Sequence, residues 1–142
     1  MKFYITADIE GTNGIVSWAE AEMDSEYYHA YARRMSQEVA AVCKGINEEA
    51  PDCSILVKDA HNNGRNIDHE LLPENVSLNR GWSGHPFKMM NRLDKSFDAA
   101  MMTGYHSGGG YGGHPLAHTM SMRTPTLTIN DRLGSEFLMN YY

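Results

Sequence analysis

Hydrophobic residues fall into short runs, with one long periodic segment between the first two. Lys2 to Ala7 is rich in Phe, Tyr and Ile and predicts a short buried strand. From about Asp24 to Glu49 apolar residues recur every three or four positions, which predicts an amphipathic helix. Asp24 or Ser25 can cap its start, and Pro51 stops it. The apolar stripe of this helix consists of Tyr31, Met35, Val39, Val42 and Ile46.

The rest of the chain predicts shorter elements. Short helices are expected over Pro86 to Leu93 and from Ser135 to Tyr142, and a glycine-rich stretch covers residues 107–113. Strands alternating with helices predict an α/β fold with a mainly parallel sheet and flanking helices. The 142 residues suit a single domain, 1–142. The further strands are expected at Cys53 to Lys58, Val76 to Asn79, Phe97 to Tyr105 and Thr126 to Asn130.

Candidate metal ligands follow three of the expected strands. Asp8 and Glu10 follow the first strand, Asp59 and His61 the second, and His106 a later one. Residues two apart in an extended segment point to the same side, so both members of each pair can reach one cation. Sites in open parallel sheets form beyond the carboxyl ends of the strands. The sequence therefore predicts a metal site at this edge of the sheet.

The ligand types narrow the choice of metal. Mixed Asp, Glu and His ligands suit Zn²⁺, or another first-row ion such as Mn²⁺ or Co²⁺, whereas Ca²⁺ would require more oxygens. Glu136 opens the last expected helix and is a further candidate. Asp59 either orients His61 or faces the site itself.

Five other histidines need an interpretation. His114 and His118 follow the glycine-rich stretch, and either can act as an acid or base beside a metal. His29, His69 and His85 have no such neighbours and are expected to be surface or packing residues.

Composition excludes several classes of protein. The net charge is −6 and the basic residues are scattered, which argues against nucleic acid as a partner. The two cysteines form neither a metal motif nor a disulfide framework. No signal peptide and no run of about 18 apolar residues is visible, so we expect a cytoplasmic protein without a membrane partner.

Five motifs together resemble one known family. They are Asp8-Ile9-Glu10-Gly11, Asp59-Ala60-His61, Gly104-Tyr105-His106, His118-Thr119-Met120-Ser121, and Ile129-Asn130-Asp131 through Gly134-Ser135-Glu136. In this order they resemble the D-aminopeptidase family, peptidase family M55. The resemblance implies a catalytic histidine at His118, with His114 as a nearby competitor. It also implies two zinc ions per subunit, with the ligands Asp8, Glu10, His61, His106 and Glu136.

The resemblance also implies an activity. Family members act on peptides with N-terminal D-residues, and the type member is a decamer, so short peptide substrates and a homo-oligomer are expected. The expected reaction is peptide hydrolysis by a water activated between two metals, and Asp8 is the first candidate for the bridging ligand because it lies deepest in its strand. Glu136 is the second candidate. Members of the family carry a further C-terminal portion, which this chain is expected to lack.

Two alternatives remain open. Another dinuclear hydrolase, such as a phosphoesterase, uses similar ligands, although only Lys58, Arg65 and Arg132 lie near the motifs to bind phosphate. A non-catalytic metal-binding fragment is the second alternative.

Overall fold

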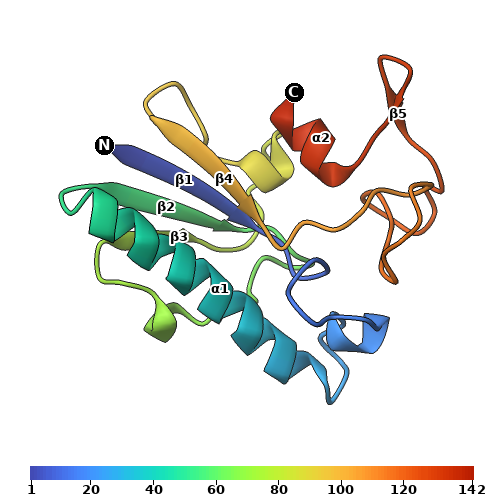
Figure 1. Cartoon of the computed structure of the whole chain (residues 1–142), viewed down its shortest axis with the longest axis horizontal. Coiled ribbons are helices and arrows are strands. Elements are labelled where there is room, and N and C mark those ends of the chain that lie inside the picture. Colours follow the sequence, from blue (N-terminus) through green and yellow to red (C-terminus); the bar gives the residue numbers. More distant parts are fainter.

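A four-stranded parallel sheet forms the centre of the computed structural model, which describes residues 1–142 (Figure 1). The strand order is β3-β2-β1-β4, and β1 pairs in parallel with both β2 and β4. The predicted α/β class and parallel sheet are confirmed. The strands are β1 (Lys2–Ala7), β2 (Ser54–Asp59), β3 (Val76–Asn79) and β4 (Ala99–Thr103).

The helix α1 (Tyr28–Glu49) covers one face of the sheet (Figure 1). Its buried residues Met35 and Val39 join Ile5 and Val57 of the strands in one core cluster. The helix starts four residues later than predicted, and neither Asp24 nor Ser25 caps it. Ser25 instead accepts a hydrogen bond from the amide of Tyr27, which closes a local turn just before the helix begins.

The opposite face is covered by the 3₁₀ turn η3 (Lys88–Met90) and the helix α2 (Glu136–Tyr141). Side chains alternate across a strand, so Tyr4 and Thr6 point away from α1. The Tyr4 hydroxyl donates to the carbonyl of Asn91 (2.8 Å), and that of Thr6 donates to the carbonyl of Met89 (2.8 Å). The helix predicted over Pro86 to Leu93 is thus a single turn held on β1.

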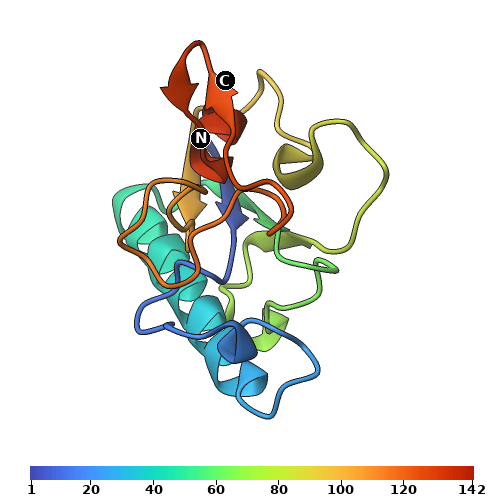
Figure 2. The same cartoon turned by 90° about the vertical axis from the view of Figure 1, so that its right-hand side faces the viewer.

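The strand predicted over Thr126 to Asn130 does not join the sheet. Instead β5 (Thr128–Ile129) pairs antiparallel with β6 (Arg132–Leu133), and Figure 2 shows this hairpin projecting from the body of the chain. Asn130 and Asp131, at its turn, have φ of 49° and 62°. Both residue types tolerate this left-handed region, so the segment pairs with its own continuation.

Two remaining 3₁₀ turns, η1 (Trp18–Glu20) and η2 (His69–Leu71), lie in loops. No helix of the structure has both the length and the apolar character needed to cross a bilayer.

Glycines let the chain close tightly around the carboxyl edge of the sheet. Gly104 has a φ of +66°, and a Cβ there would overlap the carbonyl of Asp8. A Cβ on Gly11 would overlap the carbonyl of Tyr105 in the same way, and the amide of Gly11 donates to the carbonyl of Gly104 (2.7 Å). The loops after β1 and β4 therefore lie against each other, which brings their polar residues together.

Candidate metal centre

Three carboxylates and three imidazoles meet beyond the carboxyl ends of β1, β2 and β4. All but one of these residues are buried, and His118 is half-buried. They come from five separate segments, so the predicted convergence at this edge occurs. The six residues, called the acidic-histidine cluster below, are Asp8, Glu10, His61, His106, His118 and Glu136.

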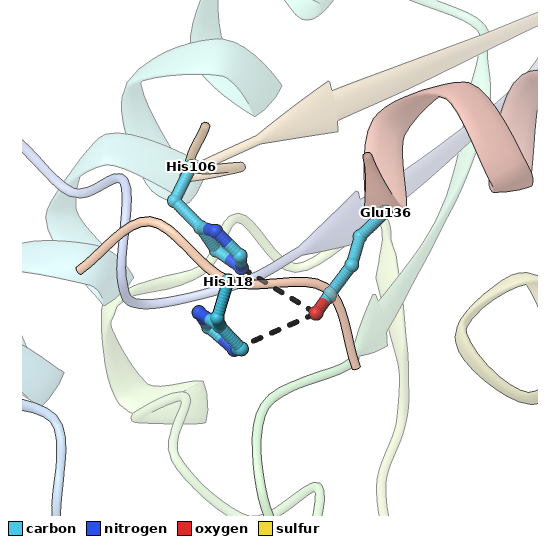
Figure 3. Close-up of side chains that lie close together, drawn as sticks. All are labelled: His106, His118 and Glu136. Atoms are coloured by element: carbon cyan, nitrogen blue, oxygen red, sulfur yellow. Dashed lines mark ion pairs between the residues drawn. The ribbon is translucent and has the colours of Figure 1, made fainter. Parts of the chain in front are cut away.

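Asp8 lies between two halves of this cluster. Its Oδ1 is 3.3 Å from Nδ1 of His61, and its Oδ2 is 3.7 Å from Nε2 of His106. On the first side, Oε2 of Glu10 is 3.0 Å from the same nitrogen of His61. On the second side, Oε1 of Glu136 is 3.5 Å from Nε2 of His106 and 3.5 Å from Nε2 of His118 (Figure 3). One carboxylate thus faces both halves with different oxygens.

Glu136 reaches the cluster from the first turn of α2. Ser135 caps this helix by accepting the amide hydrogen of Leu138 at 3.1 Å. Oε1 of Glu136 also accepts the amide hydrogen of Met120 at 2.6 Å. The short helix therefore fixes the direction of the carboxylate.

Each imidazole of the cluster holds its outer nitrogen against a backbone carbonyl. Nε2 of His61 lies 2.9 Å from the carbonyl of Ala21, and Nδ1 of His106 lies 2.9 Å from that of Ser107. Nδ1 of His118 lies 2.8 Å from the carbonyl of Leu116. A carbonyl only accepts, so each outer nitrogen carries the hydrogen and the neutral ring directs a lone pair inward. This is the tautomer that a metal-binding histidine requires.

With the rings in this neutral form, two buried atoms of the cluster lack a hydrogen-bond partner, namely Oε2 of Glu10 and Nε2 of His106. Buried polar atoms are rarely left unpaired, so such atoms need a partner from outside the chain. Asp8, Glu10 and His106 each offer a ligand atom within 4.8 Å of the others, and His106, His118 and Glu136 do the same. The oxygen and imidazole donors fit Zn²⁺.

The charges of the cluster shift its pKa values. Burial raises the pKa of Asp8 well above its ordinary value, and the charge of Glu10 acts in the same direction. Burial would also raise the pKa of Glu10, but the hydrogen bond and charge of His61 lower it to about 2. For His61, burial lowers the pKa, yet hydrogen bonds with Asp8 and Glu10 raise it to about 10. Burial also lowers the pKa of His106, and the hydrogen bond with Glu136 raises it to about 9. The carboxylates thus attract positive charge, as protons or as a cation.

His118, not His114, belongs to the cluster. Its ring stacks on that of His106, with centroids 3.9 Å apart and planes at 6°, and the edge of Trp18 meets it at 4.9 Å. Nδ1 of His114 accepts the amide hydrogen of Leu116 (3.2 Å) and closes a local turn. Of the two candidates, only His118 is therefore placed to act at the centre.

Asp59 has a different place from either one considered from the sequence. Its carboxylate accepts hydrogens from the amide and side chain of Asn66 and from the amide of Ile67, at 2.6 to 2.8 Å. The same side chain of Asn66 donates to the carbonyl of His61 (2.7 Å). Asp59 therefore holds the loop after β2 and contacts neither the ring of His61 nor the other cluster residues.

A cavity of about 550 Å³ opens in front of the cluster. Its far wall comes from the loop before η3 and from η3 itself, and no sequence pattern had predicted a site there. His85 is exposed, as expected of a surface residue, and it also lines this cavity. The wall residues are Trp82, Ser83, Gly84, His85, Pro86, Lys88, Met89 and Asn91.

Comparison with known proteins fits this geometry. The model of the peptidase M55 family, described as D-aminopeptidase, matches residues 1–142. The chain belongs to the peptidase M55 family. The family assignment made from the five motifs is thus confirmed.

This M55 chain is similar to a curated protein and to a solved structure, both from Bacillus subtilis. A D-aminopeptidase of Bacillus subtilis (strain 168) is 29% identical over 142 residues, which are 100% of this chain and 51% of the relative. The solved structure of the zinc-dependent D-aminopeptidase DppA from Bacillus subtilis, described as a self-compartmentalizing protease, superposes with a TM-score of 0.89. It is 28% identical, and the match covers 100% of this chain and 51% of that one. The chain thus spans about half the length of these relatives.

Proposed function

We propose that this protein is a zinc-dependent aminopeptidase that hydrolyses short peptides with N-terminal D-residues. The proposal rests on the position of Asp8, whose two oxygens face His61 and His106. Two ions sharing one carboxylate would be held by such an arrangement. In this proposal the metal ligands are Asp8, Glu10, His61, His106 and Glu136.

The metals would polarise the scissile carbonyl and lower the pKa of a water. The chain's own groups bind the ends of the substrate and transfer the proton. The amino end of a peptide would lie at the side of the cavity formed by Asp8, Glu10 and Glu136, where a bound metal could also hold its free amino group. Nε2 of His118, 3.9 Å from Oε1 of Glu10 and open to the cavity, can accept a proton and return it to the leaving amine.

His118 is held ready for this role by its surroundings. The stacked ring of His106 and the edge of Trp18 fix the plane of its imidazole. The bond from Nδ1 to Leu116 sets its tautomer. We therefore assign proton transfer to His118 and metal binding to the other five residues.

Phosphoester hydrolysis is less well supported. Of the basic residues considered for it, Arg65 and Arg132 do not line the cavity. Lys58 is buried and donates to the carbonyl of Gly81 at 2.6 Å. Among the residues that line the cavity a phosphate would meet one lysine, Lys88, and no arginine.

The test combines metal analysis with substrate assays. The purified protein should contain about two zinc ions per chain. It should also hydrolyse D-Ala-D-Ala and D-alanine p-nitroanilide faster than their L-counterparts. His118→Ala should lower kcat by about 10²- to 10⁴-fold while leaving the zinc content unchanged.

Two results would favour the alternatives. Hydrolysis of p-nitrophenyl phosphate without peptide hydrolysis would establish the phosphoesterase. Two bound zinc ions without any hydrolysis would establish a non-catalytic metal-binding protein.

We further propose that residues 1–142 form one catalytic domain that works within a homo-oligomer. The support is the description of the Bacillus subtilis relative as self-compartmentalizing, which requires assembly. A decamer is the expected state, testable by light scattering of the purified protein. Cys43 and Cys53 are free, buried thiols, which suits the reducing cytoplasm proposed as its location.

A further inference from the structure

The cavity in front of the acidic-histidine cluster has two walls of opposite character. One wall carries the carboxylates of Asp8, Glu10 and Glu136. The other carries His85 and Lys88, with no carboxylate among its residues. A volume of about 550 Å³ lies in the range of small-molecule sites. The cavity therefore has the metal-binding cluster on one side and cationic side chains without a carboxylate on the other.

Lys88 has no acidic partner in the chain. All six ion pairs within 4.0 Å join a histidine to a carboxylate of the acidic-histidine cluster. Lys88 is exposed and is one of the residues that line the cavity. It is thus free to bind an anion.

The backbone at Lys88 is held in an unusual conformation. Its φ of +40° lies in the left-handed region, which is strained for a lysine, and such strain gathers at functional sites. The turn is fixed on both sides, because the amide of Met90 donates to the carbonyl of Phe87 (2.7 Å) and Thr6 donates to that of Met89. The fold therefore presents this lysine at a set position.

The neighbouring part of the wall is equally ordered. Lys58 donates to the carbonyl of Gly81 (2.6 Å), and its ammonium group lies 4.2 Å from the ring centroid of Trp82. The indole of Trp82 donates to the carbonyl of Asn62 (2.6 Å). Nδ1 of His85 accepts the amide hydrogen of Phe87 (3.2 Å), which leaves the N–H on Nε2 as a donor.

We propose that Lys88, with His85 beside it, forms a subsite for the free α-carboxylate of a short peptide. This inference rests on the proposed aminopeptidase function and names the substrate class within it. The amino end of the peptide lies at the acidic-histidine cluster and the carboxylate end at Lys88 and His85. Substrates are therefore very short peptides with a free C-terminus, in preference to their neutral amides.

The first test compares D-Ala-D-Ala with D-Ala-D-Ala amide. An exposed ion pair should make the ratio of kcat/KM, acid over amide, about three- to tenfold in the wild type. In Lys88→Met the ratio should fall to about one through KM for the acid, and Lys88→Arg should restore most of it. Lys95→Met, an exposed lysine outside the cavity, is the matched control and should keep the wild-type ratio.

The second test measures binding without turnover. Calorimetric titration of His118→Ala should show tighter binding of the acid than of the amide by a similar factor, which Lys88→Met added to His118→Ala should abolish. Equal ratios in the wild type and Lys88→Met, or equal binding of acid and amide, would overturn the carboxylate subsite. Failure of the wild type to cleave either peptide would instead refute the aminopeptidase function, and the titration would still decide the subsite.

Discussion

The indole of Trp18 meets the imidazole of His118 edge-on, with ring centroids 4.9 Å apart and planes at 65°. Trp18 lies in η1, far along the chain from His118, and together with the stacked ring of His106 it confines the imidazole. The loop carrying η1 therefore contributes to the position of the proposed proton-transfer group.

Trp18→Leu should leave His118 with only one ring beside it. We expect kcat for D-Ala-D-Ala to fall by about ten- to a hundredfold because a misplaced group loses alignment, while KM changes little. Trp18→Phe should retain most of the activity because it keeps an aromatic edge. A change in KM as large as the change in kcat would contradict this positioning role. An equal fall in kcat in Trp18→Leu and Trp18→Phe would contradict it as well.

Asp8→Asn should remove more metal than Glu10→Gln. Asp8 faces His61 and His106 at 3.3 and 3.7 Å, whereas Glu10 lies 3.0 Å from His61 and reaches the other half only at 3.9 Å from His118. We expect Asp8→Asn to lose nearly all zinc and Glu10→Gln to keep about one ion per chain, as measured by elemental analysis after dialysis. Equal zinc contents in the two variants would argue against a shared carboxylate.

Zinc binding near pH 7 should release protons. Without metal, the pKa values of His61 and His106 are raised to about 10 and about 9, so both rings are protonated at pH 7. A metal needs their lone pairs and displaces about two protons per chain. Calorimetry in buffers of different ionisation enthalpy measures this number, and release near zero would contradict the assignment of these ligands.

The metal-free protein should lose stability as the pH rises above neutrality. Both histidine pKa values are higher in the folded chain than the ordinary value of 6.5. The stability that they add is therefore complete below pH 6.5 and is lost as the pH rises through about 9 and about 10. The melting temperature in chelator should fall between pH 7 and pH 10, and the double variant His61→Gln, His106→Gln should show a flatter profile.

Gly104→Ala should disturb the contact between the loops after β1 and β4. Its φ of +66° alone costs an alanine about 1 kcal/mol or more, and the added methyl group overlaps the carbonyl of Asp8. We expect a lower melting temperature and weaker zinc binding. Gly45→Ala in α1 is the matched control, because its Cβ meets no atom within 4 Å and alanine favours the helix by about 0.8 to 1 kcal/mol.

Local patterns were sufficient to predict the four strands of the sheet and the polar residues that follow them. The apolar runs ending at Ala7 and Lys58 lie between polar residues, so their strands were predicted to within one residue. The convergence of Asp8, His61 and His106 followed from the rule that parallel strands end at one edge. A general property of the fold thus brought distant residues together without further information.

The far wall of the cavity could not be predicted in this way. Trp82 and Lys88 have no periodic pattern, and their positions depend on contacts with Lys58, Asn62 and Thr6, which are distant in the sequence. The hairpin of β5 and β6 was missed for a related reason. The apolar residues near Ile129 resemble a sheet strand, but Asn130 and Asp131 turn the chain back on itself.

Main-chain carbonyls of Ala21, Ser107 and Leu116 orient the three imidazoles of the centre. Any residue type supplies a carbonyl, so substitutions at these positions leave the support intact as long as the loop keeps its path. Selection can then act on the route of the backbone rather than on side-chain identity around the histidines. The residues that supply these carbonyls could then differ widely between relatives. This is in keeping with the solved structure that is 28% identical to this chain yet superposes with a TM-score of 0.89.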